Sequence, residues 1–178
     1  RGSYAAYLDI SHPEVEEFLD VRKPTGGDVN RKSTNLHHGV LLSDEFMELI
    51  EKATKIEGFD DSWDLVDPHS GEIKKTVSAK TLWVKLIQNR VETGEPYIMF
   101  KDTVQEAVPE FQQNLGLTVH HSNLCSEITL ATDKDRTAVC CLSSVNLEEY
   151  DEWKDNDDFI PDLVRMLDNV IEFFINNA

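Results

Sequence analysis

Tyr4-Ala5-Ala6-Tyr7-Leu8-Asp9-Ile10 and Leu36-His37-His38-Gly39-Val40-Leu41-Leu42 decide the fold, because both are short apolar runs typical of buried strands. Ser11 and Glu14 lie three residues apart, as in a capping box, and predict a helix that runs to about Val21. A strand, a helix and a second strand in succession favour a parallel pair of strands.

The remaining sequence continues this alternation. Ser43 precedes a helical pattern, a helix is expected from Ser78 to Thr93 with Gly94 ending it, and Pro161 lies in the first turn of a last apolar helix. The other expected elements are a turn over residues 23–32, an irregular excursion with a small hairpin over 59–75, a short buried strand over 97–100, a loop over 105–118, and two strands over 127–130 and 137–142 joined by the charged turn 133–136. These patterns predict an α/β fold built as one domain or part of one.

The composition narrows the function. The 178 residues include 34 Asp and Glu against 17 Lys and Arg, so the formal net charge is −17. Such a chain repels nucleic-acid polymers and anionic membrane surfaces, although it can still bind a small anion through backbone amides. We find no apolar run long enough to span a bilayer and no signal peptide, so a cytoplasmic location is expected. Three cysteines form a poor disulfide framework, and we expect reduced thiols.

The segment Asn123-Leu124-Cys125-Ser126-Glu127, followed by Cys140, carries the clearest chemistry. If the segment is extended, the amide, thiol and carboxylate of Asn123, Cys125 and Glu127 lie on one face, because strand side chains alternate. Such a trio suits redox or radical chemistry on a substrate that bears hydroxyl groups, with the carboxylate accepting a proton. The alternative without a catalytic role is that Cys125 is a buried small apolar residue, as most free cysteines are.

Two other sites are disfavoured by spacing. His120, His121 and the three cysteines could supply zinc ligands, but the adjacent cysteines would face opposite ways on a strand and no Cys-x-x-Cys pair is present. Gly26-Gly27 lacks the spacing of a phosphate loop and predicts a turn. The pair His37-His38 is interpreted as a strand position with one ring inward and hydrogen-bonded.

Several stretches together resemble the large catalytic subunit of class I ribonucleotide reductase. They are Asn123 to Ile128, Thr137 to Ser143 with Cys140 fifteen positions after Cys125, Arg1 to Leu8, His12 to Leu19, Asn30 to Lys32, and Glu92 to Tyr97. The resemblance covers essentially residues 1–178. It implies a part of the ten-stranded α/β barrel of that family, in which a finger loop carries the radical cysteine through the centre.

The resemblance also implies roles for four residues. Cys125 matches the cysteine that becomes a thiyl radical and takes hydrogen from the 3′ carbon of the ribose, Glu127 the carboxylate that takes the 3′ hydroxyl proton, and Asn123 the amide that binds in the hydroxyl region. Cys140 matches one member of the dithiol that reduces the 2′ carbon and ends as a disulfide. The implied substrate is a ribonucleoside diphosphate, and no metal is expected to bind this chain.

The resemblance further implies partners and departures. The radical comes from a small subunit that contains a metal, an external thioredoxin- or glutaredoxin-type dithiol restores the thiols, nucleotide effectors regulate the enzyme, and the complete subunit forms a homodimer. The family's second redox cysteine, effector region, radical-relay tyrosines and C-terminal cysteines have no counterpart in residues 1–178. We therefore expect a central fragment that is inactive alone. The alternative is a non-catalytic product of a split or decayed reductase gene that acts as a binding or assembly module.

Overall fold

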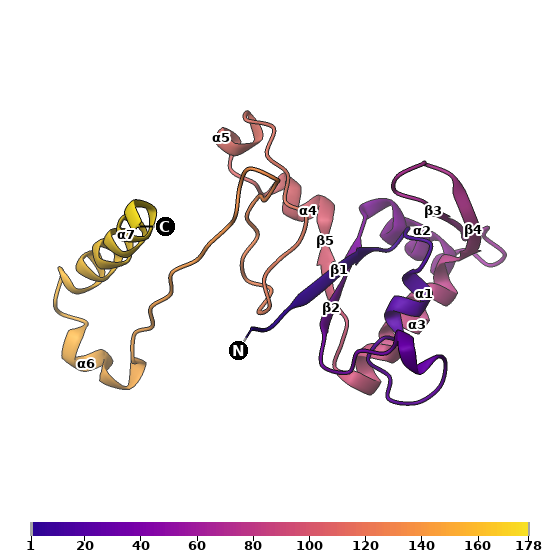
Figure 1. Cartoon of the computed structure of the whole chain (residues 1–178), viewed down its shortest axis with the longest axis horizontal. Helices are drawn as coiled ribbons and strands as arrows, with labels where there is room; N and C mark the ends of the chain where they lie inside the picture. The colour runs from indigo at the N-terminus through magenta and orange to yellow at the C-terminus, as the bar shows by residue number, and fades with distance from the viewer. Residues whose placement is uncertain (1, 178) are drawn as a thin grey trace. The chain divides into compact units, whose positions relative to one another are not determined.

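The computed structural model describes residues 2–177, and the chain divides into two compact units between Arg136 and Thr137. The first unit contains β1 (Ala5–Asp9), α1 (Val15–Leu19), η1 (Val29–Arg31), β2 (His37–Leu42), α2 (Asp44–Lys55), β3 (Ser62–Val66), β4 (Ile73–Ser78), α3 (Ala79–Thr93), β5 (Tyr97–Phe100), α4 (Lys101–Glu106) and α5 (Glu110–Gln113) (Figure 1). The second contains η2 (Leu147–Glu149), α6 (Tyr150–Trp153) and α7 (Phe159–Asn177).

The first unit is built on a three-stranded parallel sheet in the order β1-β2-β5. Tyr7 lies opposite Gly39, and Gly39 lies opposite Tyr97. The predicted strand–helix–strand unit is therefore confirmed, as are the strand positions near residues 4–10, 36–42 and 97–100. The strand β5 is less buried than predicted. Met99 is buried, Tyr97 and Ile98 are half-buried, and Phe100 is 44% exposed.

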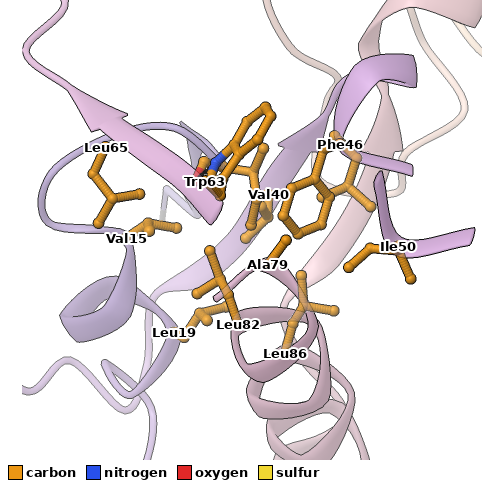
Figure 2. Close-up of a cluster of buried hydrophobic side chains, with 12 residues drawn as sticks. Val15, Leu19, Val40, Phe46, Ile50, Trp63, Leu65, Ala79, Leu82 and Leu86 are labelled. Carbon is orange, nitrogen blue, oxygen red and sulfur yellow. Dashed lines mark hydrogen bonds between the residues drawn. The ribbon is translucent and has the colours of Figure 1, made fainter. Parts of the chain in front are cut away.

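One face of this sheet carries the main hydrophobic core. Leu8, Val40 and Ile98 point to the same side and pack with residues from α1, α2, α3 and the hairpin. Figure 2 shows the centre of this cluster, where the fully buried Phe46 ring meets Trp63 edge-on at 5.1 Å between ring centroids. Trp63 Nε1 donates to the Ile10 carbonyl at 3.3 Å, so the hairpin is fixed to the end of β1.

Local caps set the ends of two helices, at Ser43 as predicted and at Ser78, where the helix begins one residue later than expected. The Ser43 hydroxyl accepts from the Phe46 N–H at the start of α2, and the Ser78 hydroxyl accepts from the Thr81 N–H at the start of α3. Gly94 ends α3 in the left-handed conformation with φ +79°, where a side chain would be strained.

The capping box predicted at Ser11 and Glu14 is wrong. The Ser11 hydroxyl and amide both donate to the Asp9 carboxylate, at 2.7 and 3.0 Å, and α1 begins only at Val15 without a side-chain cap. Asp9 is closer in sequence and competes for the same hydroxyl, so the local signal is overridden.

Two other expectations need correction. Residues 105–118 are not a plain loop, since α4 extends to Glu106 and α5 follows Pro109. The excursion over 59–75 is more regular than expected: β3 and β4 form an antiparallel hairpin with Trp63 opposite Val77 and an irregularity between Leu65 and Val66.

The second unit confirms the predicted last helix. In α7 the apolar side chains recur at helical spacing, and Pro161 lies in the first turn. Trp153 packs on Phe159 at 5.2 Å and on Tyr150 at 5.0 Å, while its Nε1 donates to the Asn146 carbonyl. No residue of α7 is buried within the described part of the chain.

The described residues do not form a closed barrel by themselves. Between residues 2 and 177, β1 and β5 each pair on one side only. No helix in this range is long and apolar enough to cross a membrane.

A buried carboxylate links β2 to the segment before β5. Glu95 accepts from the His38 N–H at 3.0 Å, contacts the His37 ring at 2.5 Å and pairs with Arg22 at 3.5 Å. The His38 ring is fully buried and lies 3.2 Å from the same carboxylate, which confirms the predicted inward, hydrogen-bonded histidine. Burial lowers the pKa of His38. Burial alone would raise the pKa of Glu95, but the His38 N–H, His37 and Arg22 together lower it.

We predict that Phe46→Ala lowers the free energy of unfolding of the first unit by about 3–5 kcal/mol, because it leaves a cavity beside Trp63. Urea unfolding followed by circular dichroism measures the change. Phe111→Ala is the control, because Phe111 is 67% exposed and its loss should cost less than about 0.5 kcal/mol. Equal effects of the two substitutions would contradict the described core.

We predict that Glu95→Gln lowers the free energy of unfolding by about 3 kcal/mol at pH 7, because it breaks a buried charge cluster. The carboxylate has a lowered folded pKa, so its stabilisation is present above the unfolded pKa of about 4.3 and is lost as the pH falls through the folded pKa. The difference between wild type and variant should therefore narrow below about pH 4 in urea titrations. Glu92→Gln is the matched control, since that side chain is 57% exposed. A difference that stays constant with pH would contradict this assignment.

Candidate functional site

The segment 117–130 crosses the second face of the sheet, opposite the main core. Val119 is buried with Met99 and Val108, and Tyr7 and Leu41 pack against this smaller cluster. Gln105 of α4 holds the start of the segment: its Oε1 accepts from the Val119 N–H at 3.0 Å and its Nε2 donates to the Leu117 carbonyl at 3.1 Å. One amide side chain thus replaces the backbone pairing that a neighbouring strand would provide.

Cys125 lies at the tip of a tight turn in this segment. The Ser126 N–H donates to the Asn123 carbonyl at 3.2 Å, and Ser126 has φ +65°, the left-handed region that is unfavourable for a residue with a side chain. The segment is therefore not extended, and the condition under which the three side chains would lie on one face is not met. The alternative that Cys125 is a buried apolar residue is wrong, because Cys125 and Glu127 are both exposed.

Asn123 closes the base of the turn with its side chain. Asn123 Oδ1 accepts from the Ile128 N–H at 3.2 Å, and the buried Ser122 hydroxyl donates to the Ile128 carbonyl at 2.6 Å. The Asn123 Nδ2 donates no hydrogen bond to any residue between 2 and 177, so this N–H₂ can donate to a bound hydroxyl.

A small cavity lies beside the turn. Its volume is about 220 Å³, and it is lined by apolar atoms of Met99 and Val104 and by hydroxyl-bearing side chains that include Tyr7, Ser122 and Ser126. A hollow of mixed apolar and hydroxyl character is suited to an uncharged polar group.

A larger cavity of about 580 Å³ lies elsewhere, around the predicted turn at Gly26-Gly27, whose glycines have φ +78° and +70°. Arg31 pairs there with Glu17, and Lys23 pairs with Asp20. Lys32 donates to the Asp20 carbonyl, and the three cations of the lining are balanced by three carboxylates, Glu17, Asp20 and Asp28. The larger hollow therefore has no net positive charge for an anion, and the chemistry of this chain points to the Cys125 turn.

Cys140 belongs to the second unit, whereas Asn123, Cys125 and Glu127 belong to the first. Cys140 is exposed and the adjacent Cys141 is half-buried, and all three thiols are free. The strands predicted over 127–130 and 137–142 are absent from the described structure, which has only an isolated bridge between Asp133 and Arg136 at the predicted turn.

Sequence reasoning missed Tyr7, Gln105 and Asp9. Asp9 pairs with Lys101 at 2.6 Å at the carboxyl end of β1; burial alone would raise its pKa, but Lys101 and the two Ser11 hydrogen bonds lower it. Gly39 within an apolar strand was the available signal for Tyr7, because a glycine there marks a close approach of another group. Within residues 2–177 no group of three or more His, Cys, Asp or Glu side chains could hold a metal ion.

Comparison with known proteins gives a consistent result. The family model described as "Ribonucleotide reductase, barrel domain" matches residues 1–177. The frog virus 3 (isolate Goorha) protein named "Putative ribonucleoside-diphosphate reductase large subunit" is 53% identical over 178 residues, which are 100% of this chain and 30% of that protein. The ribonucleoside-diphosphate reductase large subunit of invertebrate iridescent virus 3 is 44% identical, over 100% of this chain and 36% of that protein.

A solved structure supports the same relationship. The Actinobacillus ureae class Id ribonucleotide reductase alpha subunit matches 99% of this chain and 29% of its own length, with a TM-score of 0.76 and 33% identity. The chain therefore spans about a third of the length of the relatives that it matches.

We predict that Asn123→Ala speeds hydrogen exchange at the Ile128 amide about fivefold, because the acceptor of that N–H is lost. Asn123→Asp is the matched control, since a carboxylate oxygen can still accept at the same place and exchange should change less than about twofold. Mass-spectrometric hydrogen exchange of peptides spanning 120–130 measures both. Equal exchange in Asn123→Ala and wild type would exclude this contact.

Proposed function

Since the chain belongs to the ribonucleotide reductase barrel-domain family, we propose that it is the part of a ribonucleoside-diphosphate reductase large subunit that carries the radical cysteine, Cys125. The observation that carries the proposal is the exposed position of Cys125 at the tip of a turn fixed by Asn123 and followed by Glu127. A thiol presented in this way can approach a ribose ring, whereas a buried thiol could not.

Three side chains act on the sugar. Cys125, as a thiyl radical, takes the hydrogen atom from the 3′ carbon of a ribonucleoside diphosphate. Glu127 accepts the proton of the 3′ hydroxyl, which requires an ionised carboxylate within reach of that group. Asn123 donates from Nδ2 to a sugar hydroxyl while its Oδ1 remains occupied by the Ile128 N–H.

Cys140 supplies reducing equivalents. The 2′ hydroxyl leaves as water, and two electrons come from Cys140 and a second thiol of the complete subunit, which together form a disulfide. The Cys125 hydrogen then returns to the 3′ carbon, so the radical is regenerated. An external thioredoxin- or glutaredoxin-type dithiol reduces the disulfide for the next turnover. We assign this role to a thiol other than Cys141, because a disulfide between adjacent residues is strained.

The proposal also assigns roles to parts of the enzyme outside this chain. A small subunit that contains a metal supplies the radical, nucleotide effectors set activity, and the large subunit acts as a homodimer in the cytoplasm. The sheet edges at β1 and β5 are where further strands of the barrel would add, since each has one unpaired side within the described residues.

A graft tests this proposal. Residues 1–178 replace the matched 178 residues of the frog virus 3 protein, which preserves its length. With a radical-generating subunit, a nucleoside diphosphate and a dithiol, we expect deoxynucleotide formation within about tenfold of the unmodified host. Cys125→Ser should reduce product to the level without enzyme, and Glu127→Gln should lower turnover by about 10²-fold or more.

Cys140→Ser and Cys141→Ser form a matched pair of neighbouring thiols. The first should stop repeated turnover with an external dithiol, and the second should leave turnover within about twofold of the graft. Full activity of the Cys125→Ser graft would refute the radical role. An inactive graft in an active host would instead favour the non-catalytic binding module.

A further inference from the structure

Tyr7 connects the sheet to the Cys125 turn across more than 100 residues of sequence. It lies in the middle of β1, on the face that carries Leu41 and Met99 and away from the main core. Its ring is also 6.0 Å from the His121 ring, in the same segment as the turn.

Gly39 provides the space for this ring. The two residues are partners in the β1–β2 register. A Cβ atom at position 39 would lie 2.4 Å from Tyr7 Cε1 and 2.6 Å from Tyr7 Cδ1. Cβ atoms in proteins essentially never come this close to another heavy atom. The Tyr7 ring therefore lies against the bare backbone of β2, and its direction is set by the absence of a side chain there.

The Tyr7 hydroxyl reaches both sides of the turn. It lies 3.5 Å from the Asn123 carbonyl oxygen and 3.4 Å from Ser126 Oγ. Both distances exceed the range of roughly 2.5–3.0 Å that is usual for O–H···O hydrogen bonds, so each contact alone is weak. Asn123 and Ser126 are also the two residues that close the turn around Cys125, through the Ser126 N–H and the Asn123 carbonyl.

We propose that Tyr7, seated on Gly39, is a positioning residue that holds the turn so that the Cys125 thiol keeps one direction toward the substrate. The inference rests on the proposed function, because it concerns the approach of Cys125 to a ribose. Ser126 holds a left-handed φ that persists only when surrounding contacts favour it. Tyr7 lies outside the loop and contacts both Asn123 and Ser126, the two residues that close the turn.

The geometric demand explains why such a contact matters. Hydrogen abstraction needs the sulfur in contact with one carbon-bound hydrogen, and a misplacement of about 1 Å can cost about 10²-fold in rate. Loops positioned by a rigid scaffold meet this demand better than free loops. Here the sheet is the rigid scaffold. The Tyr7 ring extends from β1, lies against Gly39 of β2 and contacts the turn.

Hydrogen exchange in the 178-residue chain tests the contact. Tyr7→Phe keeps the ring and removes only the hydroxyl, and it should speed exchange of the Ser126 amide about threefold. Tyr4→Phe is the matched control, because Tyr4 is 76% exposed, and it should leave exchange unchanged. An unchanged Ser126 amide in Tyr7→Phe would overturn the proposal.

Gly39→Ala tests the seat of the ring. The added methyl group must displace the Tyr7 ring, so exchange at Ser126 should rise at least as much as in Tyr7→Phe. Tyr7→Phe should add nothing further in the Gly39→Ala background, since the hydroxyl is already displaced. Additive effects of the two substitutions would show that Gly39 does not act through Tyr7.

The grafted subunit tests the positioning role. Tyr7→Phe should lower kcat about threefold with KM for the nucleoside diphosphate within about twofold, and it should raise the isotope effect with a 3′-deuterated substrate, because abstraction becomes slower. A purely structural role would leave the isotope effect unchanged, and that result would overturn the proposal. If Cys125→Ser stays active, the proposed function fails, while the exchange data still decide whether Tyr7 holds the turn.

Discussion

The alternation of side chains in the β1-β2-β5 sheet is the constraint on which the first unit depends. Leu8, Val40 and Ile98 face the helices and the hairpin, while Tyr7, Leu41 and Met99 face the segment that carries Cys125. A shift of one residue in register would exchange these two sets and would lose both the core and the support of the turn. Parallel strands in which both faces are occupied are typical of α/β proteins.

The segment that bears the thiol is held by side chains more than by backbone pairing. Gln105 holds its start, Ser122 and Asn123 close the base of the turn, and the Tyr7 hydroxyl contacts Asn123 and Ser126. This arrangement leaves Cys125 exposed on a segment without regular secondary structure. A strand in its place would alternate its side chains and would give most of its hydrogen bonds to neighbours, so it could not project one thiol from a tip.

Features encoded within a few residues were predictable from sequence, and features that depend on distant contacts were not. Ser43 and Gly94 set helix ends through their own neighbours, so the sequence predicted them correctly, and the helix expected from Ser78 begins one residue later because Ser78 caps it. The Ser11 capping box failed because Asp9 takes the hydroxyl. The left-handed φ of Ser126 could not be predicted, because Ser126 is in contact with Tyr7, which lies 119 positions earlier in the sequence. The motif Asn123 to Glu127 nevertheless indicated the family, because a resemblance depends on residue identity and not on conformation.

The charges near the turn indicate which end of a nucleotide it can meet. The whole chain has a net charge of −17, which disfavours a polyanion, and over residues 117–130 the ionisable side chains are only His120, His121, Cys125 and Glu127. A diphosphate placed against this segment would meet a carboxylate and no Lys or Arg. A sugar would meet an amide donor, hydroxyl groups and a thiol, with a single carboxylate able to take a proton. Under the proposed function, the turn is chemically suited to the ribose, and we expect cations or helix N-termini at a distance from Cys125 to bind the phosphates.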